Sequence, residues 1–208
     1  MDQTVTKDDC CTASETRDDN YDLIVVGAGS AGFSASITAA DAGKRVALIG
    51  HGTTGGTCVN VGCVPSKAMI RAAEAVHGGA SAARFPGVEP CDHAVDWGAV
   101  VQGTTDLVEE MRHKKYIDLL PAYKSVTYIE DGPARLVEGG VAVGGRVISA
   151  PRVLIATGSR PHLPAIEGID TVEPLDSTDL LTLPDRPESI LVLGGGYIGC
   201  ELAQMASR

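Results

Sequence analysis

The spacing of apolar and polar positions predicts a strand, a helix and a second strand within the first fifty residues. Residues 21–26 (YDLIVV) and 45–49 (RVALI) are short runs rich in β-branched side chains, as in buried strands. Between them, residues 34–43 (SASITAADAG) place small and apolar side chains at helical spacing and stop at Gly43, a typical helix end. A βαβ unit of this length, about thirty residues, is typical of mononucleotide-binding folds.

The rest of the chain changes from mostly helical to mostly β-structure near Pro121. Residues 58–77 predict a helix, 78–95 a loop, and 99–120 a second long helix with apolar residues at the helical period. Beyond Pro121, short β-rich runs are separated by glycine turns, which is the pattern of a meander. These runs are residues 125–130, 135–137, 141–143 and 146–149, and two more predicted strands follow at 152–156 and 189–193.

Composition limits the classes of function. With 44% hydrophobic residues, the 208-residue chain can build a sizeable core. Its 17 basic and 27 acidic residues give a formal net charge of −10, so we expect neither nucleic acid nor an anionic membrane as a partner. Six cysteines are too few for a disulfide-stapled secreted scaffold.

Targeting signals are not evident either. The first twenty residues are acidic, which is the wrong sign for a secretory signal. The uncharged stretch 23–40 has the length of a membrane span, but it contains three glycines and three serines and changes midway from strand-like to helix-like. We therefore read it as a strand, a turn and a helix, and we expect a cytoplasmic protein.

The first glycine motif, G-x-G-x-x-G at residues 27–32, lies directly between the first strand and the first helix. In this context Gly27 allows a tight turn, Gly29 lets a pyrophosphate approach the backbone, and Gly32 lets the helix pack on the strand. The N–H groups at the helix N-terminus favour phosphate. One position departs from the usual pattern, because Gly50 stands where the second strand normally ends in a ribose-binding acid. Either the ribose contact is weakened or another group supplies it.

The most distinctive segment is the pair Cys58 and Cys63 in the sequence CVNVGC. In a regular helix these thiols would lie roughly 8 Å apart at a rise of about 1.5 Å per residue, whereas a disulfide needs Cα atoms within about 7 Å. A redox pair therefore requires a distorted start of the helix, which Gly62 and Pro65 permit. Near a helix N-terminus and Lys67, a thiolate would be stabilised and reactive. The alternatives are two reduced core cysteines, or half of a zinc site for which no distal ligand pair follows.

The second glycine motif occupies residues 194–199 (GGGYIG), again after an apolar run. Two such motifs on either side of a cysteine pair predict two nucleotides with a dithiol between them. Thr157-Gly158-Ser159 either meets the first nucleotide or forms an ordinary turn. Cys10-Cys11 is either a soft-metal ligand pair or part of an unstructured tail, and the charges of residues 109–116 (EEMRHKKY) predict a solvated helix face.

Taken together, these segments resemble the FAD-dependent pyridine nucleotide–disulfide oxidoreductases of class I. The resemblance covers residues 21–208. It is carried by YDLIVVGAGSAG, GGTCVNVGCVPSK, ATGSRP and GGGYIGCELAQ. Within the family, CVPSKAMIRAAEAVH, EEMRHKKY and GPAR are most similar to the branch that reduces mercury(II).

The fold that this resemblance implies is α/β. A Rossmann-type FAD-binding βαβ domain with a β-meander insertion would be followed by the start of a second Rossmann-type NAD(P)-binding domain. We accordingly expect an acidic disordered tail at 1–20, the FAD-binding domain at 21–160, a proline-rich connection at 161–188 and the start of the NAD(P)-binding domain at 189–208.

The resemblance also implies which motif residues hold the two cofactors. The first glycine motif, the loop before the cysteines and two later turns would bind FAD, and the second glycine motif would bind the nicotinamide dinucleotide. The implied FAD residues are Gly27, Gly29, Ser30, Ala31, Gly32, Gly56, Thr57, Lys67, Gly132, Ala134, Thr157 and Gly158. The implied residues for the second nucleotide are Gly194, Gly196, Tyr197 and Gly199.

Catalytic roles follow from the same resemblance. Cys63 would stack on the flavin as a charge-transfer thiolate, Cys58 would face the substrate, and Glu201 would pair with Lys67 beside the flavin ring. Electrons would pass from NADPH, with NADH as the alternative, through FAD to the Cys58–Cys63 disulfide pair or to Hg(II) held by thiolates. The substrate would be Hg(II) or its thiol complexes, reduced to Hg(0), and the full-length protein would be a homodimer.

Two other functions stay open at this point. One is dihydrolipoamide dehydrogenase or another thiol–disulfide reductase, and the other is a non-catalytic fragment that binds nucleotide or metal. Because the sequence stops within the second nucleotide-binding helix, we expect an N-terminal portion of a reductase that binds FAD weakly and does not turn over alone.

Overall fold

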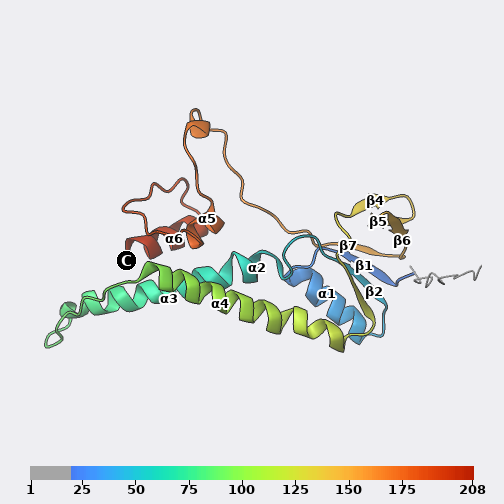
Figure 1. Cartoon of the computed structure of the whole chain (residues 1–208), viewed down its shortest axis with the longest axis horizontal. Helices are drawn as coiled ribbons and strands as arrows, with labels where there is room; N and C mark the ends of the chain where they lie inside the picture. The colour runs from blue at the N-terminus through green and yellow to red at the C-terminus, as the bar shows by residue number, and fades with distance from the viewer. Residues whose placement is uncertain (1–19) are drawn as a thin grey trace, which may run out of the picture.

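A four-stranded parallel sheet occupies one end of the molecule, with the strand order β3–β2–β1–β7 (Figure 1). The computed structural model describes residues 20–208, so Cys10, Cys11 and most of the predicted tail lie outside the described residues. All neighbouring strands are parallel and therefore end at the same edge, here called the carboxyl edge. The strands are β1 (Leu23–Val26), β2 (Val46–Ile49), β3 (Val126–Ile129) and β7 (Val153–Ile155).

Both faces of the sheet are covered at β2, whereas the edge strand β7 is exposed along its length. Helix α1 (Ser30–Asp41) covers one face, where Phe33 packs in one cluster with Leu48 of β2. A β-meander covers the other face, where Val141 packs in a second cluster with Ile49. β2 is accordingly buried throughout, and its run VALI lacks the polar alternation of a half-exposed strand.

The meander is a three-stranded antiparallel sheet. It consists of β4 (Arg135–Val137), β5 (Gly140–Val143) and β6 (Arg146–Ile148), close to the ranges that the alternation predicts. The inward residues of β5 and β6 are fully or almost fully buried, while β4 is exposed along its length. The meander therefore contributes a small apolar layer to the sheet.

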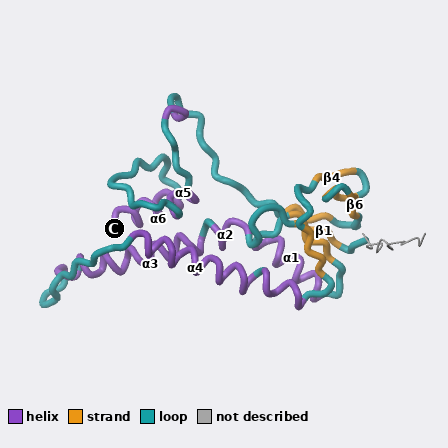
Figure 2. Tube along the Cα trace, viewed as in Figure 1, coloured by secondary structure: helices purple, strands orange, loops and turns teal. Residues whose placement is uncertain are grey.

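Two long helices extend away from the sheet as an antiparallel hairpin (Figures 1 and 2). They are α3 (Cys63–Ala80) and α4 (Trp97–Lys115), and α2 (Gly56–Asn60) precedes α3. A short 3₁₀ turn follows each long helix: η1 (Ala82–Arg84) follows α3, and η2 (Ile117–Ala122) follows α4. Across residues 20–208, the structure contains no helix with the length and apolar character needed to cross a membrane.

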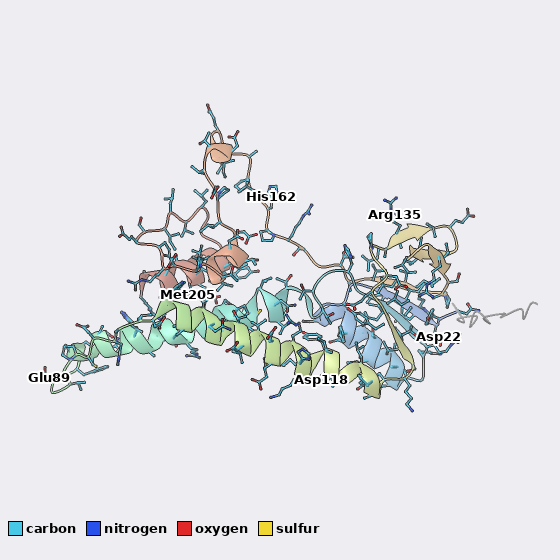
Figure 3. The ribbon with its side chains drawn as sticks, in the orientation of Figure 1. Asp22, Glu89, Asp118, Arg135, His162 and Met205 are labelled. Carbon is cyan, nitrogen blue, oxygen red and sulfur yellow. The ribbon has the colours of Figure 1, made fainter. Side chains whose placement is uncertain are left out.

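After β7 an extended connection leaves the sheet and returns to α3. Figure 3 shows His162 on this connection and Met205 close to the hairpin. The connection includes η3 (Ile169–Thr171) and α5 (Ser177–Leu181), and α6 (Tyr197–Ser207) follows it. The two helices pack on α3 in one apolar cluster, whose buried members are Met69, Leu180, Leu181, Leu202 and Met205.

The predicted α/β class with a parallel sheet is confirmed, whereas two local predictions need correction and one short helix was not predicted. The helix expected over 58–77 is broken in two at Val61 and Gly62, and it continues to Ala80 into the predicted loop. The strand expected over 189–193 is not formed, and Leu191 is 87% exposed. A strand needs a neighbour for its backbone N–H and C=O groups, and within the described part of the chain no strand pairs with this run. The short helix α5 was not predicted, although Asp176 forms a capping box with Asp179 at its start.

Replacing Gly32 by Ala should destabilise the fold strongly, because the new Cβ would overlap the carbonyl oxygen of Gly27. We expect a loss of about 2 kcal/mol in the free energy of unfolding, measured by urea denaturation. Gly103 in α4 is the matched control, since nothing lies within 4 Å of a Cβ there. Gly103→Ala should stabilise the protein by roughly 0.5–1 kcal/mol. Equal stability of Gly32→Ala and the parent would contradict this packing.

Candidate dinucleotide and dithiol site

The first glycine motif adopts the backbone that its sequence predicts. Gly27 has φ +118°, which only glycine adopts readily. A Cβ on Gly32 would lie 3.4 Å from Val25 Cγ1 as well as overlapping Gly27, so α1 begins in direct contact with β1. Gly29 caps α1 without any side-chain hydrogen bond, which leaves the N-terminal N–H groups at Ser30 and beyond available to an anion.

The glycine-rich loop before the cysteines (residues 51–57, HGTTGGT), here called the glycine loop, packs on this motif. The Gly55 N–H donates to the Ala28 carbonyl at 2.8 Å, and Gly29 and Gly55 form an isolated parallel bridge. A Cβ on Gly56 would lie 2.8 Å from the Cα of Gly29, so the two backbones touch. Thr57 follows as the second residue of α2 and is exposed. The structure thus brings Gly56 and Thr57 to the first glycine motif.

The turn after β7 closes the same edge from the other side. The Ala156 N–H donates to the Val26 carbonyl at 2.7 Å. A Cβ on Gly27 would lie 2.9 Å from the Thr157 nitrogen, and Gly158 has φ +72°. Thr157 and Gly158 therefore flank the first glycine motif. The carboxyl edge of an open parallel sheet is where such folds bind nucleotides.

The other turn implied by the resemblance lies between β3 and the meander. Gly132 has φ +109°, and no atom lies within 4 Å of the position that a Cβ would take. Ala134 is partly buried against the cluster under the meander. The Gly132 backbone is therefore open to approach, and Ala134 anchors the turn.

The second glycine motif repeats the local geometry of the first. Gly194 has φ +101°, and a Cβ on Gly199 would lie 2.8 Å from the Gly194 oxygen and 3.4 Å from Val192 Cγ1. Gly196 caps α6 as Gly29 caps α1, again without a side-chain hydrogen bond. Tyr197, the first residue of α6, is 80% exposed. The second motif thus has the local backbone geometry of the first, although the run before it forms no strand.

The two cysteines lie on either side of the break between α2 and α3. Cys58 is in α2 and Cys63 is the first residue of α3. A Cβ on Gly62 would lie 2.9 Å from the Thr57 oxygen and 3.2 Å from the Cys58 Cα, so the chain turns back tightly at this glycine. The distorted helix start that a redox pair requires is present. Both cysteines are free thiols and exposed.

The environment of the pair distinguishes the two thiols. Cys63 lies at the N-terminus of an 18-residue helix, where the helix dipole favours negative charge. A hydrogen bond with the Cys63 side chain raises the pKa of Cys58, with burial and the charge of Cys63 adding to the effect. The Lys115 ammonium acts in the opposite direction. Cys58 therefore tends to keep its proton when Cys63 carries charge. Within residues 20–208 no group of three His, Cys, Asp or Glu side chains is arranged for a metal ion.

An ion pair connects the dithiol helix with the helix of the second glycine motif. Lys67 Nζ of α3 bonds to Glu201 Oε2 of α6, and both side chains are about half exposed. Lys67 lies one helical turn after Cys63, and Glu201 one turn after Tyr197. The structure thus brings Lys67 and Glu201 together and links the second glycine motif to the cysteine pair.

A hydrogen-bond network that the sequence reading missed holds the glycine loop. Asn60 Nδ2 donates to the carbonyls of Thr54 at 2.9 Å and Gly56 at 2.8 Å, and Arg112 Nη1 donates to Asn60 Oδ1 at 3.1 Å. Tyr116 bonds through its hydroxyl to Ser30 Oγ at 2.9 Å. Asn60 and Arg112 therefore fix the loop to α4, and Tyr116 fixes the start of α1.

The prediction that the charges of residues 109–116 form a solvated face is wrong for Arg112, and the uncharged Tyr116 at the end of the segment is also buried. His113, Lys114 and Lys115 are exposed, but the Arg112 side chain is only 22% exposed and Tyr116 is buried. The helical period could have found them, because both follow buried Val108 at spacings of four.

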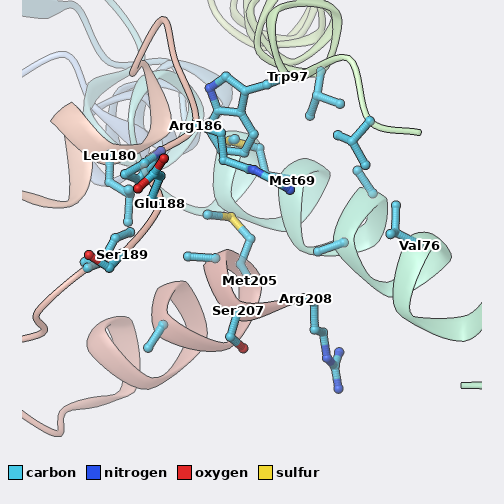
Figure 4. A pocket seen from close by; sticks show the side chains of 18 of the residues that line it. Met69, Val76, Trp97, Leu180, Arg186, Glu188, Ser189, Met205, Ser207 and Arg208 are labelled. Carbon is cyan, nitrogen blue, oxygen red and sulfur yellow. The ribbon is translucent and has the colours of Figure 1, made fainter. Parts of the chain in front are cut away.

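A separate apolar cavity of about 320 Å³ lies between α3, α4 and α6. Figure 4 shows Trp97 and Met69 on one side of it and Met205 on another. Neither cysteine nor any residue of the two glycine motifs lines it. The cavity is thus separate from the two cysteines, which are exposed on the surface.

Comparison with known proteins agrees with this arrangement. Residues 21–208 match the pyridine nucleotide-disulphide oxidoreductase family. The chain belongs to this family. It is 45% identical over 196 residues to a mercuric reductase of Streptomyces lividans, covering 90% of this chain and 40% of the relative. It is 43% identical over 189 residues to a mercuric reductase of Lysinibacillus sphaericus, covering 90% and 34%.

Solved structures give the same result. The HOCl-induced flavoprotein disulfide reductase RclA of Escherichia coli superposes with a TM-score of 0.74 at 32% identity, covering 90% of this chain and 40% of that one. Its Cu(II) complex superposes with a TM-score of 0.73 at 31% identity, covering 89% and 39%. The chain thus spans about two fifths of the length of these oxidoreductases.

In this family member the carboxyl end of β2 has an unusual neighbour. A Cβ on Gly50 would overlap the hydroxyl of Tyr128 and lie 2.8 Å from its Cε2. The Tyr128 hydroxyl lies 2.9 Å from Thr54 Oγ1 and donates to Glu130 Oε1 at 2.8 Å. Burial raises the pKa of Tyr128 to about 12, Glu130 adds to the rise, and the hydrogen bond with Thr54 opposes it. The phenol is therefore neutral at physiological pH and remains a donor.

The effect of Cys63 on Cys58 can be measured by alkylation. Cys63→Ala should lower the pKa of Cys58, because it removes the hydrogen bond and the charge that raise it. Lys115→Ala should raise that pKa, because the ammonium lowers it. The pH dependence of iodoacetamide modification, followed on the Cys58 peptide by mass spectrometry, gives the Cys58 pKa in the parent and in each variant. An unchanged midpoint in Cys63→Ala would show that the thiols do not interact.

Tyr128 should give a tyrosinate absorbance step near pH 12 that disappears in Tyr128→Phe. Glu130→Gln should move the step to lower pH, and Thr54→Val to higher pH. Since an unfolded tyrosine has a pKa of about 10, the folded protein holds this proton more tightly. That contribution to stability is complete below about pH 10 and is lost as the pH rises toward 12. A spectrum with no step above pH 11 would contradict the buried phenol.

Proposed function

We propose that this chain is part of an FAD-dependent mercury(II) reductase that uses NADPH. The observation that carries the proposal is the Cys58–Cys63 pair at the start of α3, close behind a glycine loop that touches the first glycine motif. Identities of 35–45% to proteins named mercuric reductase support the choice of substrate. The family description supports a pyridine nucleotide, and the flavoprotein neighbours support a flavin.

The residues present fit a dinucleotide at the first glycine motif. Side chains on Gly27, Gly32 or Gly56 would overlap neighbouring backbone atoms, so only glycine allows the closely packed loops that a dinucleotide-binding turn requires. In our proposal the N–H groups at Ser30 and Ala31 hold the pyrophosphate, and Thr157 and Gly158 close over it. A bound FAD would supply two-electron transfer between the nicotinamide and the dithiol. Gly132 and Ala134 would support the adenosine end, and Thr57 and Lys67 would face the flavin.

The two cysteines would have different roles in the reaction. Cys63, at the helix N-terminus, would carry the negative charge of the reduced pair, and Cys58 would keep its proton through the hydrogen bond with Cys63. Hg(II) is a soft cation that binds thiolate sulfur strongly. Hg(II) bound between the Cys58 and Cys63 sulfurs would displace that proton. Two electrons that NADPH supplies, passed on through a bound FAD, would then convert the bound Hg(II) to Hg(0) and leave both cysteines reduced.

Lys67 and Glu201 would link the two cofactors. Their ion pair holds the helix of the second glycine motif against the dithiol helix. Gly194, Gly196 and Gly199 would bind the pyrophosphate of NADPH, and exposed Tyr197 would lie next to the nicotinamide. A preference for NADPH over NADH is part of the proposal.

The domain division expected from the sequence also remains a proposal. The extended connection after β7 supports a boundary near residue 161, and the repeated glycine geometry supports a second nucleotide-binding unit from residue 189. A homodimer and a cytoplasmic location stay predictions.

The proposal is tested by reducing the FAD-reconstituted protein with NADPH and then adding Hg(II). A long-wavelength charge-transfer band should appear at the two-electron stage and be lost in Cys63→Ser, while Cys91→Ser, at an exposed cysteine distant in sequence, should retain it. Hg(II) should then discharge the band by binding the thiolates, and further NADPH should supply the two electrons that release Hg(0). A band that Hg(II) leaves intact but lipoamide or another disulfide discharges would indicate a thiol–disulfide reductase. A protein that never takes up FAD would contradict the flavoenzyme.

A further inference from the structure

The carboxyl end of β2 lacks the acid that usually binds ribose, and the Tyr128 ring occupies the space where the side chain of such an acid would begin. Nucleotide-binding βαβ units place an Asp or Glu at this point to accept the ribose hydroxyls. Here the Tyr128 ring occupies the direction of the missing side chain, with Cε2 and Cζ 2.8 and 2.9 Å from an ideal Cβ on Gly50. The absence of a side chain at Gly50 therefore leaves room for the Tyr128 ring on β3. A carboxylate that binds the ribose would have to come from another residue.

Glu130 is placed at the same point of the sheet edge. β3 pairs in parallel with β2, with Ile49 opposite Ile129. The Gly50 N–H donates to the Ile129 carbonyl at 2.9 Å, so Glu130 lies beside Gly50 where the next strand ends. Glu130 is the residue directly after β3, and its carboxylate accepts a hydrogen bond from the Tyr128 hydroxyl.

The Glu130 carboxylate is held in place by hydrogen bonds and still has acceptor positions available. Tyr128 donates to Glu130 Oε1 at 2.8 Å, and Thr54 Oγ1 lies 3.4 Å from the same oxygen. Thr54 belongs to the glycine loop that docks on the first glycine motif, so this small network joins the carboxylate to the loops around the pyrophosphate site. Both bonds reach Oε1, and a carboxylate has about four lone-pair positions on its two oxygens. Glu130 is exposed and can accept further hydrogen bonds.

We propose that Glu130 accepts the 2′- and 3′-hydroxyls of the adenosine ribose of the dinucleotide held by the first glycine motif. Tyr128 and Thr54 act as positioning residues for this carboxylate. The inference rests on the proposed binding of FAD and deepens it, because it moves the ribose-binding acid from β2 to β3. A vicinal diol is the chemical group that the carboxylate recognises, and its negative charge disfavours a 2′-phosphate at this position.

The test compares FAD with its analogue lacking both adenosine ribose hydroxyls, using flavin fluorescence to measure affinity. The parent protein should bind FAD more tightly than the analogue. Glu130→Gln should weaken FAD binding about tenfold, the usual scale for losing hydrogen bonds to a charged group. It should leave binding of the dideoxy analogue unchanged. Glu138→Gln, the same charge change in the exposed turn between β4 and β5, should alter neither affinity.

Tyr128→Phe provides the second variant, because it keeps the ring over Gly50 and removes only the hydroxyl. It should weaken FAD binding less than Glu130→Gln, and combining the two should add nothing to Glu130→Gln alone. Equal affinities of Glu130→Gln and the parent for FAD would overturn the assignment while leaving the flavoenzyme intact. Equal losses with FAD and with the dideoxy analogue would also overturn it. Failure of the parent to bind FAD at all would refute both proposals, and that outcome is recognised before any variant is compared.

Discussion

The site depends on the direct approach of one glycine backbone to another at the carboxyl edge of the sheet. Gly56 touches Gly29, and Gly32 touches Gly27, with no room for a Cβ in either contact. The first contact places the loop before α2 on the first glycine motif, and the second sets the start of α1. Because Cys58 follows Gly56 by two residues, the same contact determines where the dithiol lies relative to the nucleotide site.

A second layer of polar contacts keeps this backbone arrangement in place. Asn60 holds two carbonyls of the glycine loop and is itself held by Arg112 of α4. Tyr116, directly after the end of α4, bonds to Ser30 and packs edge-on against Phe33, with ring centroids 4.9 Å apart. The C-terminal end of α4 therefore holds both the glycine loop and the start of α1 in place.

The sequence predicted what depends on local pattern. The glycine motifs, the parallel strands and the broken helix start at the cysteines all follow from spacing and from the conformations open to glycine. Contacts between distant residues could not be predicted in this way. Gly50 reads as a missing acid until Tyr128, far away in the sequence, is seen to occupy its space. Likewise Leu191 looks like part of a strand, yet strand formation depends on a partner that its own sequence does not specify.

The contact between α3 and α6 consists of an ion pair and an apolar cluster, which respond differently to ionic strength. Lys67 and Glu201 are about half exposed, so their attraction contributes at most about 1 kcal/mol and is screened by dissolved ions over roughly 8 Å at physiological concentrations. The part of this contact that salt does not screen is the apolar packing around Met69 and Met205. Methionine side chains are unbranched and adapt their shape readily. Dissolved salt therefore weakens the ion pair between α3 and α6, whereas the apolar contact between the two helices does not depend on charge and persists.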